Sequence, residues 1–257
     1  MRLKNWNELP ENMKTPEVAR YYRILEKKKT ALFFKRLFDI VVSAILLVLL
    51  SPVFLVLVAA IKLTSKGPVF FRQQRVTTNG RIFRIFKFRT MVADAEKRGA
   101  QVTSKNDSRI TPVGRVIRKC RLDEIAQLLN ILDGSMTFVG TRPEVPKYVA
   151  RYTPEMMATL LLPAGVTSEA SIKYKDEDRL LEGAENVEEA YVNLVLPGKM
   201  KYNLESLEKF GFWNDIGIMF KTFAAVAFGS RKQPEPPAQD KQETPQEEKV
   251  PVGGRVN

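Results

Sequence analysis

Residues 40–61 form an apolar stretch, IVVSAILLVLLSPVFLVLVAAI, that carries no charged side chain. About 22 such residues are enough for an α-helix to cross a bilayer. However, Ser51-Pro52 lies at the middle of the stretch. Proline removes a backbone hydrogen bond and bends a helix. The pattern therefore predicts two short helices joined by a break at Ser51 and Pro52.

Lysine and arginine lie on both sides of this stretch, within residues 27–36 and again within residues 62–75. Positive flanks prefer the cytoplasm, so a single crossing would carry one flank to the wrong side of the membrane. A helix–break–helix hairpin that enters one leaflet keeps both flanks inside, and we favour this interpretation. A single spanning helix and a buried helix of a soluble domain remain as alternatives.

Two segments that follow, VFFRQQRV at residues 69–76 and RIFRIFKFRT at residues 81–90, have the composition of β-strands. Asn79-Gly80 lies between them and suits the positive φ angles of a tight turn, so we expect a β-hairpin. Residues 82–88 alternate only partly between apolar and basic, which leaves an interfacial helix as an alternative. Aromatic residues interleaved with basic ones suit a nucleic-acid platform or a membrane–water boundary equally well.

The remaining segments are shorter. We expect a helical arm at the membrane surface in residues 1–33 and an amphipathic helix in residues 122–131 that buries Leu128 and Ile131. Residues 139–146 read as a Gly/Pro loop. Three further predictions complete the chain: mixed helix and loop in residues 169–206, a helix in residues 215–228, and a disordered, proline-rich tail in residues 230–257.

The chain of 257 residues has a net charge of +12 and no histidine. Residues 62–121 hold sixteen Lys and Arg against three acidic residues, so this segment accounts for the excess and indicates an anionic partner. The absence of histidine excludes a Ser-His-Asp triad and zinc sites built on imidazole. The single cysteine, Cys120, cannot form an internal disulfide and fits a reducing compartment.

An acidic pair, Asp123-Glu124, lies within this basic region. One explanation is local, because Asp at a helix N-cap and Glu in the first turn are both favoured. Another is chemical, because Arg118 and its basic neighbours precede the pair and Arg142 follows in a loop. Arginine matches phosphate oxygens, and a carboxylate among arginines keeps a low pKa. Such a carboxylate is a candidate nucleophile or Mg²⁺ ligand.

The chain resembles the bacterial sugar transferases, the monotopic phosphoglycosyl transferases that act on polyprenyl phosphate. The resemblance covers about residues 35–163, in the order and spacing of the family. It rests on KRLFDI at residues 35–40, Ser51-Pro52, KGPVFFRQQRV at 66–76, NGRIFRIFKFRTM at 79–91, SRITPVGRVIRKCRLDEIAQLLNILDGSM at 108–136 and VGTRPEV at 139–145.

The resemblance implies a mainly helical α+β fold, in which a re-entrant membrane helix hairpin is docked to a small cytoplasmic globular domain with a short β-hairpin. The expected parts are an N-terminal arm (1–33), the helix–break–helix (34–64), a catalytic domain (65–229) and the tail (230–257). The implied location is the cytoplasmic face of the bacterial inner membrane. Partners would be a UDP-sugar, polyprenyl phosphate and membrane lipid; a homo-oligomer stays open, and no nucleic acid is expected.

The resemblance also implies roles for individual residues. Asp123 and Glu124 would be catalytic, with Asp123 as the nucleophile that expels UMP and Glu124 helping to hold Mg²⁺. Phosphate would be bound by Arg118, Arg142 and Pro143. The chain departs from the family pattern at Thr141 in the Thr-Arg-Pro loop and again in residues 171–183, SIKYKDEDRLLEG. The second departure implies a different sugar specificity.

A different class of protein is also compatible with the charge and the interleaved aromatic residues: a non-enzymatic, membrane-anchored basic protein that binds nucleic acid or anionic lipid. That alternative gives no reason for Asp123-Glu124 or for the Gly/Pro loops.

Overall fold

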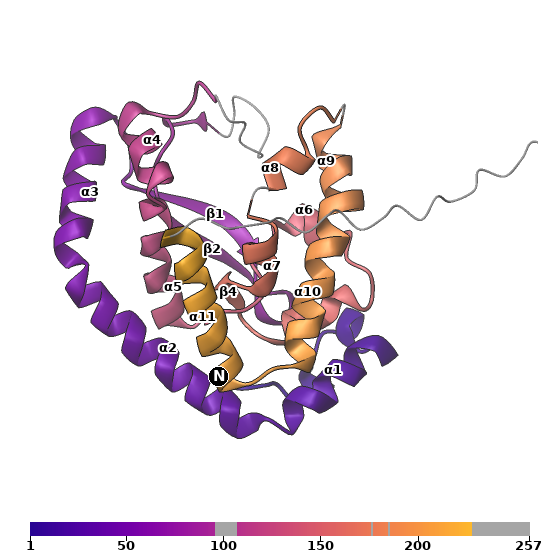
Figure 1. Ribbon diagram of the computed structural model, residues 1–257. Coiled ribbons are helices and arrows are strands. Elements are labelled where there is room, and N and C mark those ends of the chain that lie inside the picture. Colours follow the sequence, from indigo (N-terminus) through magenta and orange to yellow (C-terminus); the bar gives the residue numbers. More distant parts are fainter. Residues whose placement is uncertain (96–106, 176, 185, 228–257) are drawn as a thin grey trace, which may run out of the picture.

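The computed structural model describes residues 1–95, 107–175, 177–184 and 186–227. Helices predominate, and two small sheets of two strands each make the fold α+β, as predicted. The tail expected in residues 230–257 lies outside the described residues. In Figure 1 the two longest N-terminal helices, α2 (Lys29–Leu49) and α3 (Ser51–Thr64), curve along the outer edge of the molecule.

The predicted break between these helices is confirmed. α2 and α3 meet at Leu50 with a bend of 61°. Pro52 lies in the first turn of α3, where its missing N–H leaves the carbonyl of Val48 without a helical donor. The Ser51 hydroxyl donates to this carbonyl at 2.8 Å. The pair Ser51-Pro52 therefore makes the bend and also supplies the hydrogen bond that the bend removes.

Within the described residues, no single helix has both the length and the apolar character for a membrane span, but the bent pair α2–α3 has both when taken together. The side of α2 that faces the protein is polar: Lys35, Asp39 and Ser43 are all buried there. The opposite side exposes large apolar side chains, among them Phe33, Leu37, Val41, Ile45 and Val48. This is the reverse of a helix on a water-soluble domain.

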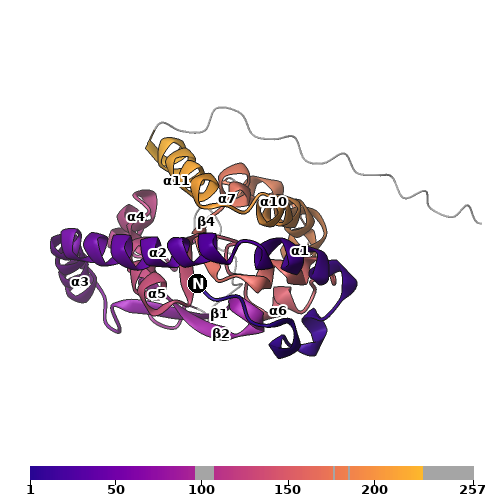
Figure 2. The same cartoon turned by 90° about the horizontal axis from the view of Figure 1, so that it is seen from below.

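The predicted β-hairpin is also confirmed, and the alternative of an interfacial helix is wrong. β1 (Phe70–Val76) pairs with β2 (Ile82–Phe88) in an antiparallel sheet, with Val76 opposite Ile82. Asn79 and Gly80 both have positive φ, at 55° and 74°. Figure 2 shows this sheet on one side of the molecule and the helices α10 (Leu196–Glu208) and α11 (Phe212–Ala227) on the opposite side.

A second sheet is parallel and joins β3 (Met136–Val139) to β4 (Ala164–Thr167). The chain after β3 runs very close to β4, because a Cβ on Gly165 would overlap the backbone of Gly140. The remaining helices surround these sheets: α4 (Pro112–Lys119), the 3₁₀ helix η5 (Leu122–Gln127), α5 (Leu128–Asp133), α6 (Pro146–Val149), η6 (Met156–Leu161), α7 (Glu169–Lys173), α8 (Glu177–Leu180) and α9 (Val187–Ala190).

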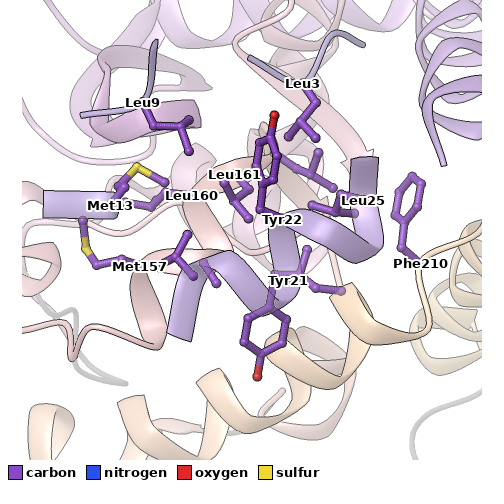
Figure 3. Close-up of a cluster of buried hydrophobic side chains, with 14 of the residues drawn as sticks. Leu3, Leu9, Met13, Tyr21, Tyr22, Leu25, Met157, Leu160, Leu161 and Phe210 are labelled. Carbon is purple, nitrogen blue, oxygen red and sulfur yellow. The ribbon is translucent and has the colours of Figure 1, made fainter. Parts of the chain in front are cut away.

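The N-terminal segment contains the expected helix, α1 (Pro16–Glu26), which begins after Thr15 as N-cap. Its apolar residues recur at helical spacing and are buried against η6 rather than exposed (Figure 3). The Tyr21 hydroxyl donates to Glu155 at 2.7 Å. The segment expected to be an arm at the membrane surface therefore forms part of the largest apolar core.

The helix pair α2–α3 packs on the same elements that carry the acidic pair. Leu57 and Ile61 of α3 contact a cluster that includes Phe88 of β2, Ile117 of α4 and Ala126 of η5. Leu128 and Ile131 are buried, as predicted, but the segment 122–131 is a 3₁₀ helix followed by a short α-helix rather than one continuous helix.

Candidate active site

The acidic pair lies in η5, which begins directly after Arg121. Arg121 has a left-handed backbone, with φ at 56°, and no side chain caps the helix. The explanation of Asp123 as an N-cap is therefore wrong. At this end of η5 the backbone N–H of Glu124 donates to the Arg121 carbonyl oxygen, at 3.4 Å.

Glu124 is the centre of an ion-pair cluster. Lys87 Nζ of β2 donates to Glu124 Oε1 at 3.0 Å, and the Arg142 guanidinium contacts the same carboxylate through both terminal nitrogens. Arg142 also donates to the carbonyl of Val166 in β4, at 3.3 Å. Burial alone would raise the pKa of Glu124, but Arg142 and Lys87 outweigh it and hold that pKa well below its usual range.

Asp123 is in a different electrostatic situation. It is half-buried, and both cations contact Glu124 rather than Asp123. Burial raises the pKa of Asp123; Lys87 and, more weakly, Arg118 oppose this, whereas the charge of Glu124 adds to it. The expectation of a low pKa for both carboxylates is therefore right for Glu124 and wrong for Asp123. The two acids have been separated by their environments, as in many catalytic pairs.

The structure brings together most, but not all, of the residues expected at the site. Pro143 follows Arg142, and its carbonyl accepts a hydrogen bond from Arg75 at 3.0 Å. Arg118 is partly exposed on α4; it makes no hydrogen bond with Asp123, but its charge acts to lower the pKa of that residue. Ser51 and Pro52 lie at the bend of α2–α3 and belong to the membrane prediction rather than to this cluster.

Sequence reasoning missed Lys87 and Arg75. A signal for both was present, because the inward face of the hairpin repeats every second residue. Phe83 and Ile85 are buried, and Lys87 follows them on the same face; Arg75 lies directly opposite Phe83. A cation on the buried face of a strand requires an anionic partner. For Lys87 that partner is Glu124.

A magnesium ion was expected with Glu124 as ligand. Among the described residues, no group of three His, Cys, Asp or Glu side chains could hold a metal ion by itself. Mg²⁺ is commonly held by one or two carboxylates together with substrate phosphates. Asp123 makes no ion pair with a described residue, and Glu124 Oε2 has only a 3.5 Å contact with Arg142. This donor set fits an ion that arrives with a phosphate-bearing substrate.

Comparison with known proteins identifies the family of the chain. The family model described as "Bacterial sugar transferase" matches residues 30–229. The chain belongs to the bacterial sugar transferase family. All the described elements from α2 to α11 fall within the match except the first residue of α2, and the match includes the whole Lys87–Glu124–Arg142 cluster.

Several characterised sugar transferases are similar to this chain. The UDP-N-acetylgalactosamine-undecaprenyl-phosphate N-acetylgalactosaminephosphotransferase of Aeromonas hydrophila is 35% identical over 77% of this chain and 45% of its own length. The UDP-glucose:undecaprenyl-phosphate glucose-1-phosphate transferase of Klebsiella pneumoniae is 37% identical over 74% of this chain and 39% of its own length. This chain therefore spans less than half the length of these two relatives. The UDP-glucose:undecaprenyl-phosphate glucose-1-phosphate transferase of Caulobacter vibrioides is 33% identical over 75% of this chain and 69% of its own length.

Proposed function

We propose that this sugar transferase moves a sugar-1-phosphate from a UDP-sugar to polyprenyl phosphate and releases UMP, as the first membrane step of a glycan pathway. The relatives act, by their names, on UDP-sugars and undecaprenyl phosphate. The observation that carries the proposal is the division of labour in the acidic pair: Glu124 holds two cations, while Asp123 keeps its carboxylate free of them. The alternative of a non-enzymatic binding protein explains neither this arrangement nor the family.

In the proposed mechanism, a carboxylate oxygen of Asp123 attacks the phosphorus that bears the sugar. The bond from this phosphorus to the bridging oxygen breaks, and UMP leaves with the electron pair. An oxygen of polyprenyl phosphate then attacks the same phosphorus and releases the Asp123 carboxylate. Arg142 and Lys87 neutralise charge on the phosphates, and Arg118 extends this positive surface. Phosphoryl transfer needs positioning and charge neutralisation, which explains how a chain without histidine can catalyse it.

Magnesium would be held by Asp123 or Glu124 together with the diphosphate, and when bound it would supply positive charge to the phosphate oxygens. Arg142 contacts both carboxylate oxygens of Glu124, which leaves little capacity for a metal ion. We therefore infer that Glu124 positions the cations and contributes at most one oxygen to the metal.

The inverted surface of α2 supports a membrane location for this chemistry. Its large exposed side chains are apolar, whereas the charged Lys35 and Asp39 face the domain, so lipid is a better solvent than water for the outer face. We infer that α2 and α3 form a re-entrant hairpin at the cytoplasmic face of the bacterial inner membrane. The lipid acceptor would then reach Asp123 from the membrane side, where α3 packs against η5.

The test combines turnover with detection of the covalent species. Purified protein in lipid nanodiscs, with a UDP-sugar, Mg²⁺ and polyprenyl phosphate, should release UMP. Without the acceptor, the peptide that carries Asp123 should gain the mass of one phosphosugar. Asp123→Asn should abolish both signals, whereas Glu124→Gln should form the adduct slowly. An adduct on another residue, or full activity of Asp123→Asn, would refute the mechanism.

A further inference from the structure

A second buried polar cluster lies next to the Arg142 loop and has no part in the mechanism above. Its centre is Lys199 of α10, whose ammonium group contacts three oxygens: Tyr191 Oη at 2.9 Å, Glu144 Oε1 at 3.4 Å and Glu177 Oε2 at 3.0 Å. The Tyr191 hydroxyl donates to Glu144 at 2.6 Å. All three donors of the ammonium group are thus used by this cluster.

Local structure places each member. Tyr191 begins a π-helical turn, Tyr191–Val195, that precedes Pro197; such turns are frequent at functional sites. Gly198 of α10 lies against Tyr174, since a Cβ there would overlap the tyrosine hydroxyl. The N–H of Glu177 donates to the Tyr174 carbonyl at 3.2 Å. The small residue at 198 thereby allows the segment before α8 to approach Lys199.

The cluster is unequal in its exposure to solvent. Glu144 and Lys199 have side chains that are only 6% exposed, whereas the Glu177 side chain is 33% exposed. Glu144 also lies within electrostatic range of Arg75, so it has more than one source of positive charge. Glu177 uses one oxygen, Oε2, on Lys199; its other oxygen makes no hydrogen bond to a described residue. This second oxygen is therefore an acceptor with unused hydrogen-bonding capacity.

Glu177 is joined to the Arg142 loop through Lys199, which contacts both Glu177 Oε2 and Glu144 Oε1; Glu144 lies two residues after Arg142. The charge of Glu177, like that of Glu144, also raises the pKa of the Arg142 guanidinium. α8 lies at the same end of the molecule as α4, which carries Arg118 (Figure 1). A carboxylate repels phosphate but readily accepts a hydrogen bond from a hydroxyl group. The cationic side of the site would thus bind the phosphates of a nucleotide sugar, and the acidic side would bind its hydroxyl groups.

We propose that Glu177, held by Lys199, recognises a hydroxyl group of the nucleotide sugar, on either the transferred sugar or the ribose. This rests on the proposed function and adds to it the residue that reads the substrate. It also gives a physical reason for the unusual SIKYKDEDRLLEG segment, because that segment delivers Glu177 to Lys199.

The experiment compares wild type, Glu177→Ala and a control, Glu182→Ala, which removes an exposed carboxylate from the same segment. The donor is whichever of UDP-glucose, UDP-galactose and UDP-N-acetylgalactosamine gives most UMP with wild type. Each protein is then assayed with analogues that lack one hydroxyl, at sugar C3, C4 or C6 or at ribose C2′. Wild type should lose about 10- to 150-fold in kcat/KM with one analogue, the range for a hydrogen bond to a charged group.

Glu177→Ala should shrink that loss to within about threefold, and Glu182→Ala should leave it intact. The analogue whose penalty disappears identifies the hydroxyl and decides between sugar and ribose. Penalties that persist unchanged in Glu177→Ala would overturn the inference. If wild type releases no UMP from any donor, the proposed function fails; calorimetric binding of the same UDP-sugars and analogues to Asp123→Asn, with and without Glu177→Ala, then tests the inference independently.

Discussion

The electrostatic division between Asp123 and Glu124 depends on Lys87, so Lys87→Met is the most informative single change. Lys87 Nζ lies 3.0 Å from Glu124 Oε1, and its charge is the largest influence opposing the effect of burial on Asp123. Methionine keeps most of the length and removes the charge. Loss of one hydrogen bond to a charged group costs about 1.5–3 kcal/mol, so kcat/KM should fall about 10- to 150-fold at neutral pH.

The same change should alter the pH dependence. In the proposed mechanism Asp123 must be ionised to attack, so activity should be present above the pKa of Asp123 and should disappear as pH falls through it. Burial already raises this pKa, and removal of Lys87 takes away an influence that lowers it. The acid limb of kcat/KM should therefore move to higher pH in Lys87→Met.

The assay is UMP release in nanodiscs across a pH series, with two controls. Lys87→Arg retains the charge, so its acid limb should stay near that of wild type. Lys119→Met removes an exposed cation from α4 and should leave both rate and pH profile unchanged. An acid limb in Lys87→Met that stays in place or moves to lower pH would refute the electrostatic reasoning, whatever the loss in rate.

Three further predictions concern the bend, the phosphate grip and the tie between membrane helix and domain. Pro52→Leu restores a helical donor and should favour a spanning helix, so a cysteine at Lys66, in a chain without Cys120, should become labelled from the periplasm; labelling of the parent chain there would reject the hairpin. Arg142→Lys should lose about tenfold or more in kcat/KM because it loses a two-nitrogen contact, against little change for exposed Arg121→Lys. Asp39→Asn weakens the hydrogen bonds from α2 to β3 and should lower the free energy of unfolding by about 1–3 kcal/mol, measured by thermal unfolding. An unchanged melting temperature would show that Asp39 does not hold α2 to β3.

The sequence predicted the features that depend on the local backbone. Pro52 removes a donor in whatever fold it lies, so the break was visible in the sequence. Asn and Gly both tolerate positive φ whatever the fold, and Asn79 and Gly80 adopt it here, so the hairpin was equally clear. The resemblance supplied the acidic pair and Arg142, and the structure has placed these together.

The features that could not be predicted depend on contacts between distant segments. Four basic residues just before the pair, Arg115, Arg118, Lys119 and Arg121, were candidates to neutralise it, yet the ion-pair partners of Glu124 come from β2 and from the loop after β3. Arg118 is close to Asp123 in sequence, but only its charge reaches that residue. The burial that raises the pKa of Asp123 arises when α3, β2 and α4 pack around η5. The packing of the N-terminal segment could not be predicted for the same reason, since its partner η6 lies far along the chain; its location at the membrane surface stays a prediction.

The polar face of α2 connects the proposed membrane hairpin to the candidate active site. Asp39 accepts hydrogen bonds from the Thr137 hydroxyl at 2.7 Å and from the backbone N–H of Phe138 at 3.2 Å, both in β3. The chain that leaves β3 passes Gly140 and brings Arg142 to Glu124 of η5; α5 and β3 lie between the two residues in sequence. A carboxylate in a membrane-facing helix is costly unless its partners are fixed. Asp39 therefore fixes the position of α2 relative to β3, and so relative to the loop that carries Arg142.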